Sequence, residues 1–309
     1  MSRLVVLIPD EREKPRGGIM NLVRQCAVAR HVGADAVLAT PTGKDSHAKR
    51  WFRHQEKVIK WSDRKPDDIC LIPDMYSDQV GEHQGPCIVY EQAPLLISAD
   101  FDHLRENVQI WTDSPFMLEK CHAIFPGVEI PIVPNVVDNV AFPFTPQEAK
   151  RNGLMIVFPR KGADFIKATF SLYKKQGGVY WKPKALKKMR LDKMASVFCQ
   201  AEAFLASGED EGCALPPQEA MSAGVVVVGK SAKGANFSMR HGETALISES
   251  VEDTVDSFFR LEDAALRRKL SIAGHEFISR YHPDREPADF WRRVLNGDFG
   301  DVAIAPAGN

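Results

Sequence analysis

Residues 207–224 read SGEDEGCALPPQEAMSAG, and four valines follow at 225–228. This order of residue types predicts the end of a strand, a glycine-containing loop, a short helix and then a buried strand. Two prolines at the start of the helix fit this interpretation, because proline lacks the N–H group that would stay unpaired in a first helical turn. The segment is therefore typical of an α/β fold.

Short apolar runs alternate with amphipathic stretches along most of the chain. We expect strands at 4–8, 36–39, 69–72, 87–90, 108–112, 154–158, 203–206 and 225–228, and helices at 19–31, 165–175, 185–199 and 217–223. This alternation predicts parallel sheets with helices on both faces. A polar stretch with several prolines at 131–152 separates two such series. The sequence thus predicts two doubly wound α/β domains that join near residue 145.

Composition fits a globular protein. The 309 residues are about twice a typical domain of ~150 residues, and 44 % hydrophobic with 26 % charged residues exclude a disordered or collagen-like chain. A net charge of −1 gives no overall attraction to nucleic acid, so no nucleic-acid partner is expected. No apolar run approaches the ~20 residues of a membrane span, and the first is too short for a signal peptide. We therefore expect a cytoplasmic protein.

Cysteine and histidine spacing bears on metal binding. The six cysteines show no CxxC pattern and the nine histidines show no HExxH or HxH pattern. This spacing predicts free thiols in a reducing compartment and no metal site.

One segment departs from the neutral average. Residues 160–193 contain eleven lysines and arginines against two aspartates, an excess of nine positive charges. A solvated helical face would explain this excess, and so would a surface that faces a nucleotide diphosphate or the phosphate layer of a membrane. Both interpretations stay open, so peripheral contact of 160–193 with the inner face of a membrane is one expectation.

Two glutamates flank the predicted helix start. Glu211 lies in the loop and Glu219 lies in or near the first turn. A helix start binds anions, and ionised carboxylates accept hydrogen bonds from hydroxyl groups. A nucleotide sugar offers both a diphosphate and sugar hydroxyls. The other interpretation is structural, because acidic residues near a helix N-terminus also complement the helix dipole.

The residues around the two glutamates resemble the signature of the retaining glycosyltransferases of family 4. That signature is a glutamate, seven residues and a second glutamate, typically E-G-F-G-L-P-x-x-E-A-M-A-x-G, and this chain reads EGCALPPQEAMSAG at 211–224. The resemblance continues in HGETALI at 241–247, PRGG at 15–18, PNVVD at 134–138 and FPRKG at 158–162. It thus extends over most of the chain.

The resemblance implies a GT-B fold, in which two Rossmann-like α/β domains face each other across a cleft. Residues 1–145 would form an acceptor-side domain, and a helix at 286–297 would pack back on it. Residues 146–285 would form the nucleotide-sugar donor domain, trimmed because 177–185 is too short for a complete extra strand and helix. The implied activity is transfer of a sugar to a hydroxyl acceptor, a glycan or a lipid-linked acceptor, with retention of configuration.

The resemblance also implies roles for single residues. Glu211 would hold the sugar hydroxyls and Glu219 the ribose. Arg160 and Lys161 would neutralise the diphosphate as it leaves, since fixed cations aimed at developing charge lower a barrier. The donor would also contact the backbone of Gly17, Gly18, Gly212, Cys213, Ala214 and Leu215. No cofactor and no metal ion are expected.

Two other functions stay open. A chain with a trimmed second domain could bind nucleotide sugars without transferring them. Asp100 and Asp102 form a DxD motif, which in another glycosyltransferase fold binds a divalent metal, although here it is expected to begin a helix. Many family members carry a histidine where this chain has Glu91 and Gln92, so the acceptor-side chemistry is open as well.

Overall fold

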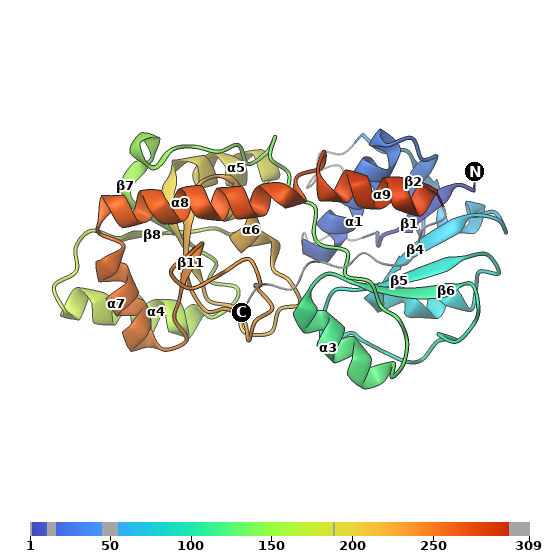
Figure 1. The fold of residues 1–309 in the computed structure, drawn as a ribbon, viewed down its shortest axis with the longest axis horizontal. Coiled ribbons are helices and arrows are strands. Elements are labelled where there is room, and N and C mark those ends of the chain that lie inside the picture. Colours follow the sequence, from blue (N-terminus) through green and yellow to red (C-terminus); the bar gives the residue numbers. More distant parts are fainter. Residues whose placement is uncertain (1, 11–16, 45–54, 188, 297–309) are drawn as a thin grey trace. The chain divides into compact units, whose positions relative to one another are not determined.

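The computed structural model describes residues 2–10, 17–44, 55–187 and 189–296, and the chain divides into two units. The first unit runs to Val136 and takes up the chain again at Pro283, and the second unit is Val137–His282. The sequence predicted these domain boundaries at residues 145 and 285. The C-terminal part of the first unit is the helix α9 (Glu286–Leu295) (Figure 1).

The first unit is built on a parallel sheet. Its described strands are paired in the order β3-β2-β1-β4-β5-β6. They are β1 (Leu4–Leu7), β2 (Ala36–Thr40), β3 (Val58–Lys60), β4 (Ile69–Pro73), β5 (Cys87–Glu91) and β6 (Val108–Thr112), with helices α1 (Gly17–His31) and α3 (Pro115–Ile124) and 3-10 turns η1 (Trp61–Asp63) and η2 (Asp74–Val80). The central strands are apolar and buried on both faces, as parallel strands covered by helices require.

Helix α9 completes the core of the first unit. Its apolar face carries Phe290 and Trp291, which pack with α1 and with Trp111 of β6. The rings of Trp111 and Phe290 lie 5.0 Å apart, and Trp291 Nε1 donates a hydrogen bond to Gln25 Oε1 at 2.7 Å. Residues from the two ends of the sequence therefore share one core.

The second unit has its own parallel sheet, with the described strands in the order β11-β10-β9-β7-β8. The strands are β7 (Arg151–Val157), β8 (Lys182–Ala185), β9 (Ala201–Ala206), β10 (Val226–Gly229) and β11 (Ala245–Ile247). The helices are α4 (Ala163–Lys175), α5 (Leu191–Gln200), α6 (Leu215–Ser222), α7 (Val251–Arg260) and α8 (Ala264–Ile278), with 3-10 turns η3 (Gln147–Ala149) and η4 (Ser279–Tyr281). No helix in the described ranges is long and apolar enough to cross a membrane.

All eight predicted strands are present, but the helix predicted at 185–199 is wrong in its first turns. Strand β8 occupies 182–185 and pairs in parallel with β7, and helix α5 begins only at Leu191. The expectation that 177–185 is too short for a complete extra strand and helix, from which a trimmed domain was inferred, is therefore corrected: the strand fits within it and the helix follows at 191–200. This strand could not be predicted from hydrophobicity, because it contains Lys182, Pro183 and Lys184. Charged residues and proline are typical of an exposed sheet edge rather than of a buried strand.

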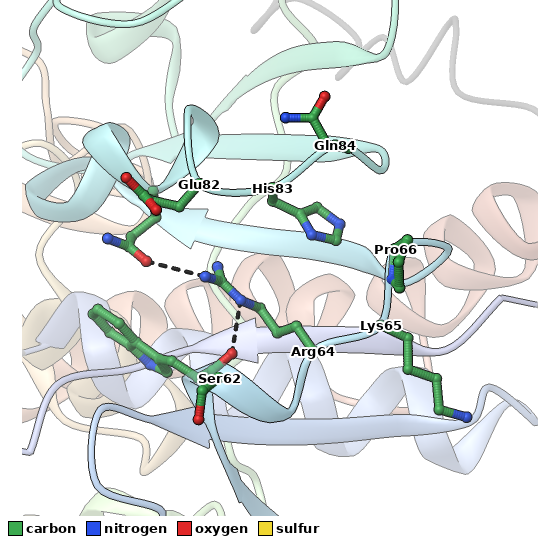
Figure 2. A pocket seen from close by; sticks show the side chains of 9 residues that line it. Ser62, Arg64, Lys65, Pro66, Glu82, His83 and Gln84 are labelled. Atoms are coloured by element: carbon green, nitrogen blue, oxygen red, sulfur yellow. Dashed lines mark hydrogen bonds between the residues drawn. The ribbon is translucent and has the colours of Figure 1, made fainter.

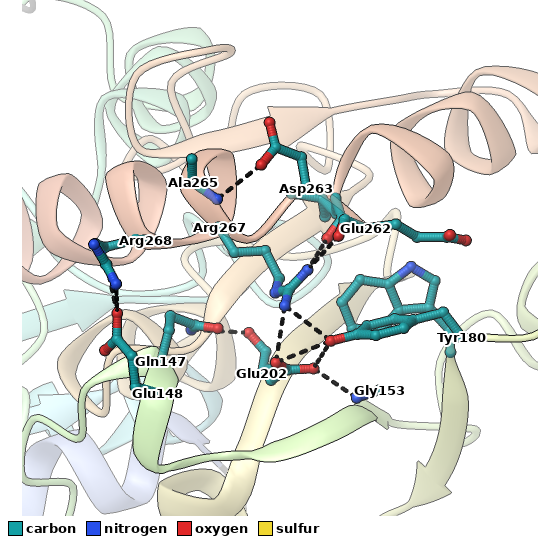
Figure 3. Close-up of polar contacts among 12 residues, drawn as sticks. Gln147, Glu148, Gly153, Tyr180, Glu202, Glu262, Asp263, Ala265, Arg267 and Arg268 are labelled. Carbon is teal, nitrogen blue, oxygen red and sulfur yellow. Dashed lines mark hydrogen bonds and ion pairs between the residues drawn. The ribbon is translucent and has the colours of Figure 1, made fainter.

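A buried ion pair fixes the amino edge of the second sheet, where its strands begin (Figure 3). Arg267 of α8 donates from Nη2 to Glu202 Oε1 at 3.1 Å, and Glu202 Oε2 accepts from Gly153 N at 2.6 Å and Tyr180 OH at 2.8 Å. Arg267 Nη1 also donates to two backbone carbonyl groups just after α7. Both carboxylate oxygens of this pair are thus satisfied in a site closed to water.

Candidate functional site

Three of the predicted site residues lie at the carboxyl edge of the second sheet, where the strands end. Arg160 and Lys161 follow β7, and Glu211 lies in the loop after β9; Lys230, which was not predicted, follows β10. The carboxyl ends of neighbouring parallel strands meet at one edge, and ligands of open α/β sheets bind there.

Lys161 and Glu211 are brought together from loops fifty residues apart. Lys161 Nζ forms an ion pair with Glu211 Oε2, and their side chains are 41 % and 15 % exposed. Ser207 Oγ donates to the carbonyl oxygen of Lys161 at 2.6 Å. Gly162 has φ +76°, and a Cβ there would lie 2.2 Å from the Ser207 carbonyl oxygen. Only glycine allows this close approach of the two loops.

The loop backbone also approaches the Glu211 carboxylate closely. A Cβ on Gly208 would lie 2.6 Å from Glu211 Oε1. A side chain at position 208 would therefore require the Glu211 carboxylate to shift. Glycines at 162 and 208 thus leave room for the two loops and for this ion pair.

A second ion pair at this edge was not predicted from the sequence. Lys230 Nζ binds Glu209 Oε1 and lies 4.5 Å from the centre of the Phe165 ring. The hydrogen bond and the positive charge of Lys230 hold the pKa of Glu209 below its ordinary value. The position of Lys230, directly after the buried valine strand, was the available signal, because that position lies at the same edge.

Arg160 is not part of either ion pair. Its side chain is exposed and has no hydrogen-bond or ion-pair partner among the residues that the structure describes. It is therefore a cation that a ligand could engage without breaking an existing contact.

The start of α6 offers fewer free amide groups than the sequence predicts. Leu215 is the first helical residue and Pro216 and Pro217 follow, so two of the first four positions have no N–H group. The amide of Ala214 donates to Asn236 Oδ1 at 3.3 Å, and Cys213 is buried. The predicted anion site at this helix start is thereby reduced to little more than the amide of Leu215 and the loop before it.

Glu219 lies inside the second unit. Its exposed fraction is 0 %, and nearly every residue of α6 is buried with it. A ribose could reach this carboxylate only if neighbouring groups moved. Its role in ribose binding stays a prediction.

Gly17 and Gly18 begin helix α1 in the first unit. A Cβ on Gly18 would lie 3.3 Å from Gln92 Nε2, and Gln92 Oε1 accepts from Asn21 Nδ2 at 3.0 Å. The preceding residues of the predicted glycine loop, Pro15 and Arg16, lie outside the described residues. The two glycines thus lie at the carboxyl edge of the first sheet, beside the end of β5.

A pocket of about 540 Å³ in the first unit contains none of the predicted residues (Figure 2). Arg64 borders it and donates to Trp61 O at 2.9 Å and to Gln79 Oε1 at 3.2 Å. His83, also on its wall, is bonded to Asp68 O at 2.8 Å. Arg64 Nε and Nη2 and the His83 ring are thus bonded to the protein, whereas Arg64 Nη1 is buried without a hydrogen-bond partner among the described residues.

Within the described part of the chain, no three histidine, cysteine or acidic side chains are grouped so as to hold a metal ion. Asp100 and Asp102 are exposed and lie among turns, so the expectation that they begin a helix is wrong. Asp100 Oδ2 accepts a hydrogen bond from Ser98 Oγ at 2.8 Å, a local contact of a turn.

Solved structures resemble the chain over nearly its whole length, although no family model and no curated protein matches its sequence. A sucrose-phosphate synthase from Thermosynechococcus elongatus is 11 % identical, with a TM-score of 0.68 over 96 % of this chain and 100 % of that one. Anabaena HepE, solved with UDP and glucose, is 11 % identical, with a TM-score of 0.69 over 96 % and 100 %. A glycosyltransferase from Rickettsia africae is 10 % identical, with a TM-score of 0.67 over 96 % and 97 %.

At these identities the likeness establishes the fold. The chain has the GT-B fold of these glycosyltransferases, which confirms the predicted fold class.

Proposed function

We propose that the chain is a glycosyltransferase that moves a sugar from a nucleotide sugar to the hydroxyl of a glycan or lipid-linked acceptor, with retention of anomeric configuration. The observation that carries this proposal is the contact of Lys161 with Glu211 at the carboxyl edge of the second sheet. The fold supports it further, since HepE, which shares that fold, has been solved with UDP and with UDP-glucose.

The partly exposed ion pair can bind both the diphosphate and the sugar of the donor. Lys161 exchanges Glu211 for the diphosphate, and the released Glu211 carboxylate accepts hydrogen bonds from sugar hydroxyls. Arg160, which has no partner to lose among the described residues, joins Lys161 on the diphosphate. As the bond between the anomeric carbon and the diphosphate oxygen breaks, both cations stabilise the charge that develops on the leaving group.

Retention follows if the acceptor attacks on the face that the diphosphate leaves. The departing diphosphate then takes the proton of the acceptor hydroxyl as the new bond to the anomeric carbon forms. No protein carboxylate becomes covalently attached in this mechanism. Glu219 would bind the ribose, and the backbone of Gly17, Gly18, Gly212, Cys213, Ala214 and Leu215 would contact the donor.

A two-stage experiment tests this function. Thermal-shift measurements with UDP-, GDP-, ADP- and dTDP-sugars identify the donor, and release of the nucleoside diphosphate is then followed with and without hydroxyl acceptors. We expect acceptor-dependent release and, by NMR, a product with the anomeric configuration of the donor. Binding without release would instead identify a nucleotide-sugar-binding protein, and an inverted product would contradict the mechanism.

We propose further that transfer needs no divalent metal ion and no cofactor. Arg160 and Lys161 already provide cations for the diphosphate, and the exposed pair Asp100 and Asp102 lies in an ordinary turn. Activity that persists in EDTA is the expected result. Loss of turnover in EDTA that manganese restores would support a metal-dependent mechanism.

The role of the basic segment 160–193 stays a prediction. Strand β8 is the edge strand of the second sheet, and its exposed residues Lys182, Pro183 and Lys184 discourage pairing with another chain. This structural role accounts for part of the positive charge. Contact with an anionic membrane would account for the rest.

A further inference from the structure

The loop after β9 brings negative charge to the edge where the donor diphosphate is proposed to bind. It carries Glu209, Asp210 and Glu211 in a row, and negative charges repel an anionic ligand. The proposed function uses Glu211 for the sugar hydroxyls and gives the other two no task. Glu209 Oε1 forms an ion pair with Lys230 Nζ, whereas Asp210 has no ion-pair or hydrogen-bond partner among the described residues. The pair of Glu209 with Lys230 therefore needs an explanation.

Lysines reach this loop from both sides. Strand β9 lies between β7 and β10 in the sheet, and the three strands end nearly level. Lys161, which follows β7, forms an ion pair with Glu211. Lys230, directly after β10, forms the corresponding pair with Glu209. A diphosphate bound beyond the end of β9 would therefore have a lysine on each side of it.

In the pair with Lys230, the carboxylate is the outer partner. The Glu209 side chain is 58 % exposed and the Lys230 side chain only 12 %. The Lys230 ammonium lies 4.5 Å from the centre of the Phe165 ring, so the carboxylate and the ring together cover it. Among the described residues, Lys230 is the only hydrogen-bond or ion-pair partner of the Glu209 carboxylate. Because an ion pair with such an exposed partner is weak in water, a change of the Glu209 rotamer is enough to uncover the lysine.

The backbone that carries Lys230 is held in place. Its N–H group donates to the carbonyl oxygen of the last residue of β9 at 2.9 Å, and Ser231 donates to Glu249 Oε1 from both N and Oγ, at 2.9 Å and 2.7 Å. Ala232 and Lys233 then adopt left-handed backbone angles, with φ 54° and 58°. Such angles are unfavourable at residues other than glycine, persist only where the surroundings fix them, and are frequent at ligand sites. The cation is thus fixed, whereas its carboxylate partner can turn away.

We propose that Lys230 is a third cation of the donor site and binds the diphosphate together with Arg160 and Lys161. Glu209 occupies this cation in the free protein, and the donor displaces it. The inference rests on the proposed transferase function. The two glutamates of the loop then have different tasks, because the released Glu211 turns to the sugar hydroxyls and the released Glu209 makes no contact with the donor.

The test measures anion binding by calorimetry in ~0.15 M salt, where the charges of distant residues are screened. The probes are inorganic pyrophosphate and UDP, with GDP, ADP and dTDP as alternatives. Lys230→Met removes the ammonium and keeps an unbranched side chain. Glu209→Gln removes the competing charge, and Asp210→Asn removes the same charge at the neighbouring position, which forms no ion pair with Lys230. Circular dichroism checks that each variant is folded.

The two partners of the pair should give effects of opposite sign. Lys230→Met should weaken binding of pyrophosphate and of the nucleoside diphosphate roughly 10–100-fold, since a charge-assisted hydrogen bond is lost. Glu209→Gln should strengthen binding about fivefold, and Asp210→Asn should strengthen it less than about twofold. In the Lys230→Met background, the gain from Glu209→Gln should fall to that of Asp210→Asn. A pair that only held the loop in shape would give weaker binding when either partner is removed.

Three results overturn this inference alone: weaker binding in Glu209→Gln, a gain no larger than that of Asp210→Asn, or unchanged binding in Lys230→Met. A wild-type chain that binds neither pyrophosphate nor any of the four nucleoside diphosphates overturns the proposed function and the inference with it.

Discussion

The two edges of the second sheet carry the same kinds of charged residue and surround them differently. At the amino edge, Arg267 and Glu202 have side chains 7 % and 2 % exposed, and several hydrogen bonds hold the pair. At the carboxyl edge, Lys161 and Glu211 are 41 % and 15 % exposed and meet in a single ion pair. A pair locked in place can only stabilise the fold, whereas an open pair can exchange its partners for a ligand.

The first unit shows the same difference between its edges. Just before β4 begins, Asp68 accepts two hydrogen bonds from Arg3, at 2.6 Å and 3.1 Å, and one from the amide of Lys65. At the end of β5, Glu91 is as deeply buried as Asp68 and has no partner among the described side chains and backbone groups. The well-bonded charged groups thus lie at the amino edges of both sheets, and the more weakly bonded ones lie at the carboxyl edges, where the proposed function places the ligands.

The largest effect on stability is expected at the amino edge of the second sheet. Arg267→Met leaves Glu202 buried without its countercharge, which should lower the free energy of unfolding by ~3–5 kcal/mol. The control is Arg268→Met one residue further along α8, where the ion pair with Glu148 is 62 % and 53 % exposed. That variant should lose less than ~1 kcal/mol in denaturant titrations. Equal losses of unfolding free energy in both variants would show that the buried ion pair at the amino edge stabilises the fold no more than an exposed one.

Removing a cation from the carboxyl edge should affect turnover instead. Lys161→Ala and Arg160→Ala should each lower turnover by ~10²–10³, because a charge that stabilises the leaving diphosphate is lost. Their free energies of unfolding should change by less than ~1 kcal/mol, since both side chains are substantially exposed. Lys167→Ala on the exposed face of α4 serves as the control and should keep wild-type turnover. Wild-type rates in Arg160→Ala would refute its role on the leaving group.

Glu219 of α6 differs from both ion pairs, because it is fully buried and is nevertheless predicted to bind the ligand. Glu219→Ala should weaken UDP binding by roughly 10–100-fold if the carboxylate accepts ribose hydrogen bonds. Affinity for inorganic pyrophosphate, which has no ribose, should stay the same. Calorimetry with both ligands separates the two cases, and equal loss for UDP and pyrophosphate would indicate a structural role only.

The buried acid of the first unit should make stability depend on pH. The pKa of Glu91 is raised to about 8 in the folded chain, so its protonated form stabilises the fold at low pH and this contribution is lost as pH rises through 8. Glu91→Gln does not titrate and should therefore gain ~1–3 kcal/mol relative to the wild type between pH 5 and pH 9. Thermal unfolding over this range measures the difference. Parallel pH profiles for the two proteins would show that Glu91 is already ionised at pH 5.

The smallest effect concerns the exposed lysines of β8. If segment 160–193 touches anionic lipid, changing Lys182 and Lys184 to serine should weaken binding to phosphatidylserine vesicles by about 1 kcal/mol per charge and reduce its salt dependence. Sedimentation with vesicles at low and high salt measures this. A wild-type chain that does not bind the vesicles leaves protection of the sheet edge as the function of these lysines.

Apolar strands and the loop signature made much of the fold predictable. The strand that was not predicted, β8, has charged residues at the edge of its sheet. Buried runs such as 225–228 identify strands by hydrophobicity alone, whereas β8 consists mostly of exposed lysine and proline. The contact between Lys161 and Glu211 follows from strand order, which no local pattern encodes. That Glu91 is buried without a hydrogen-bond partner among the described residues is a property of the packed molecule rather than of its sequence.

The return of α9 to the first unit affects how this chain folds during synthesis. Trp111 and Gln25 emerge from the ribosome early, but their packing partners Phe290 and Trp291 are made only after the whole second unit. At ~5–20 residues per second, the delay is roughly 10–30 s. During that time the α1 face of the first sheet is exposed and prone to aggregation, while the second unit already has all of its own core residues. The nascent N-terminal unit thus lacks part of its core for longer than the second unit does.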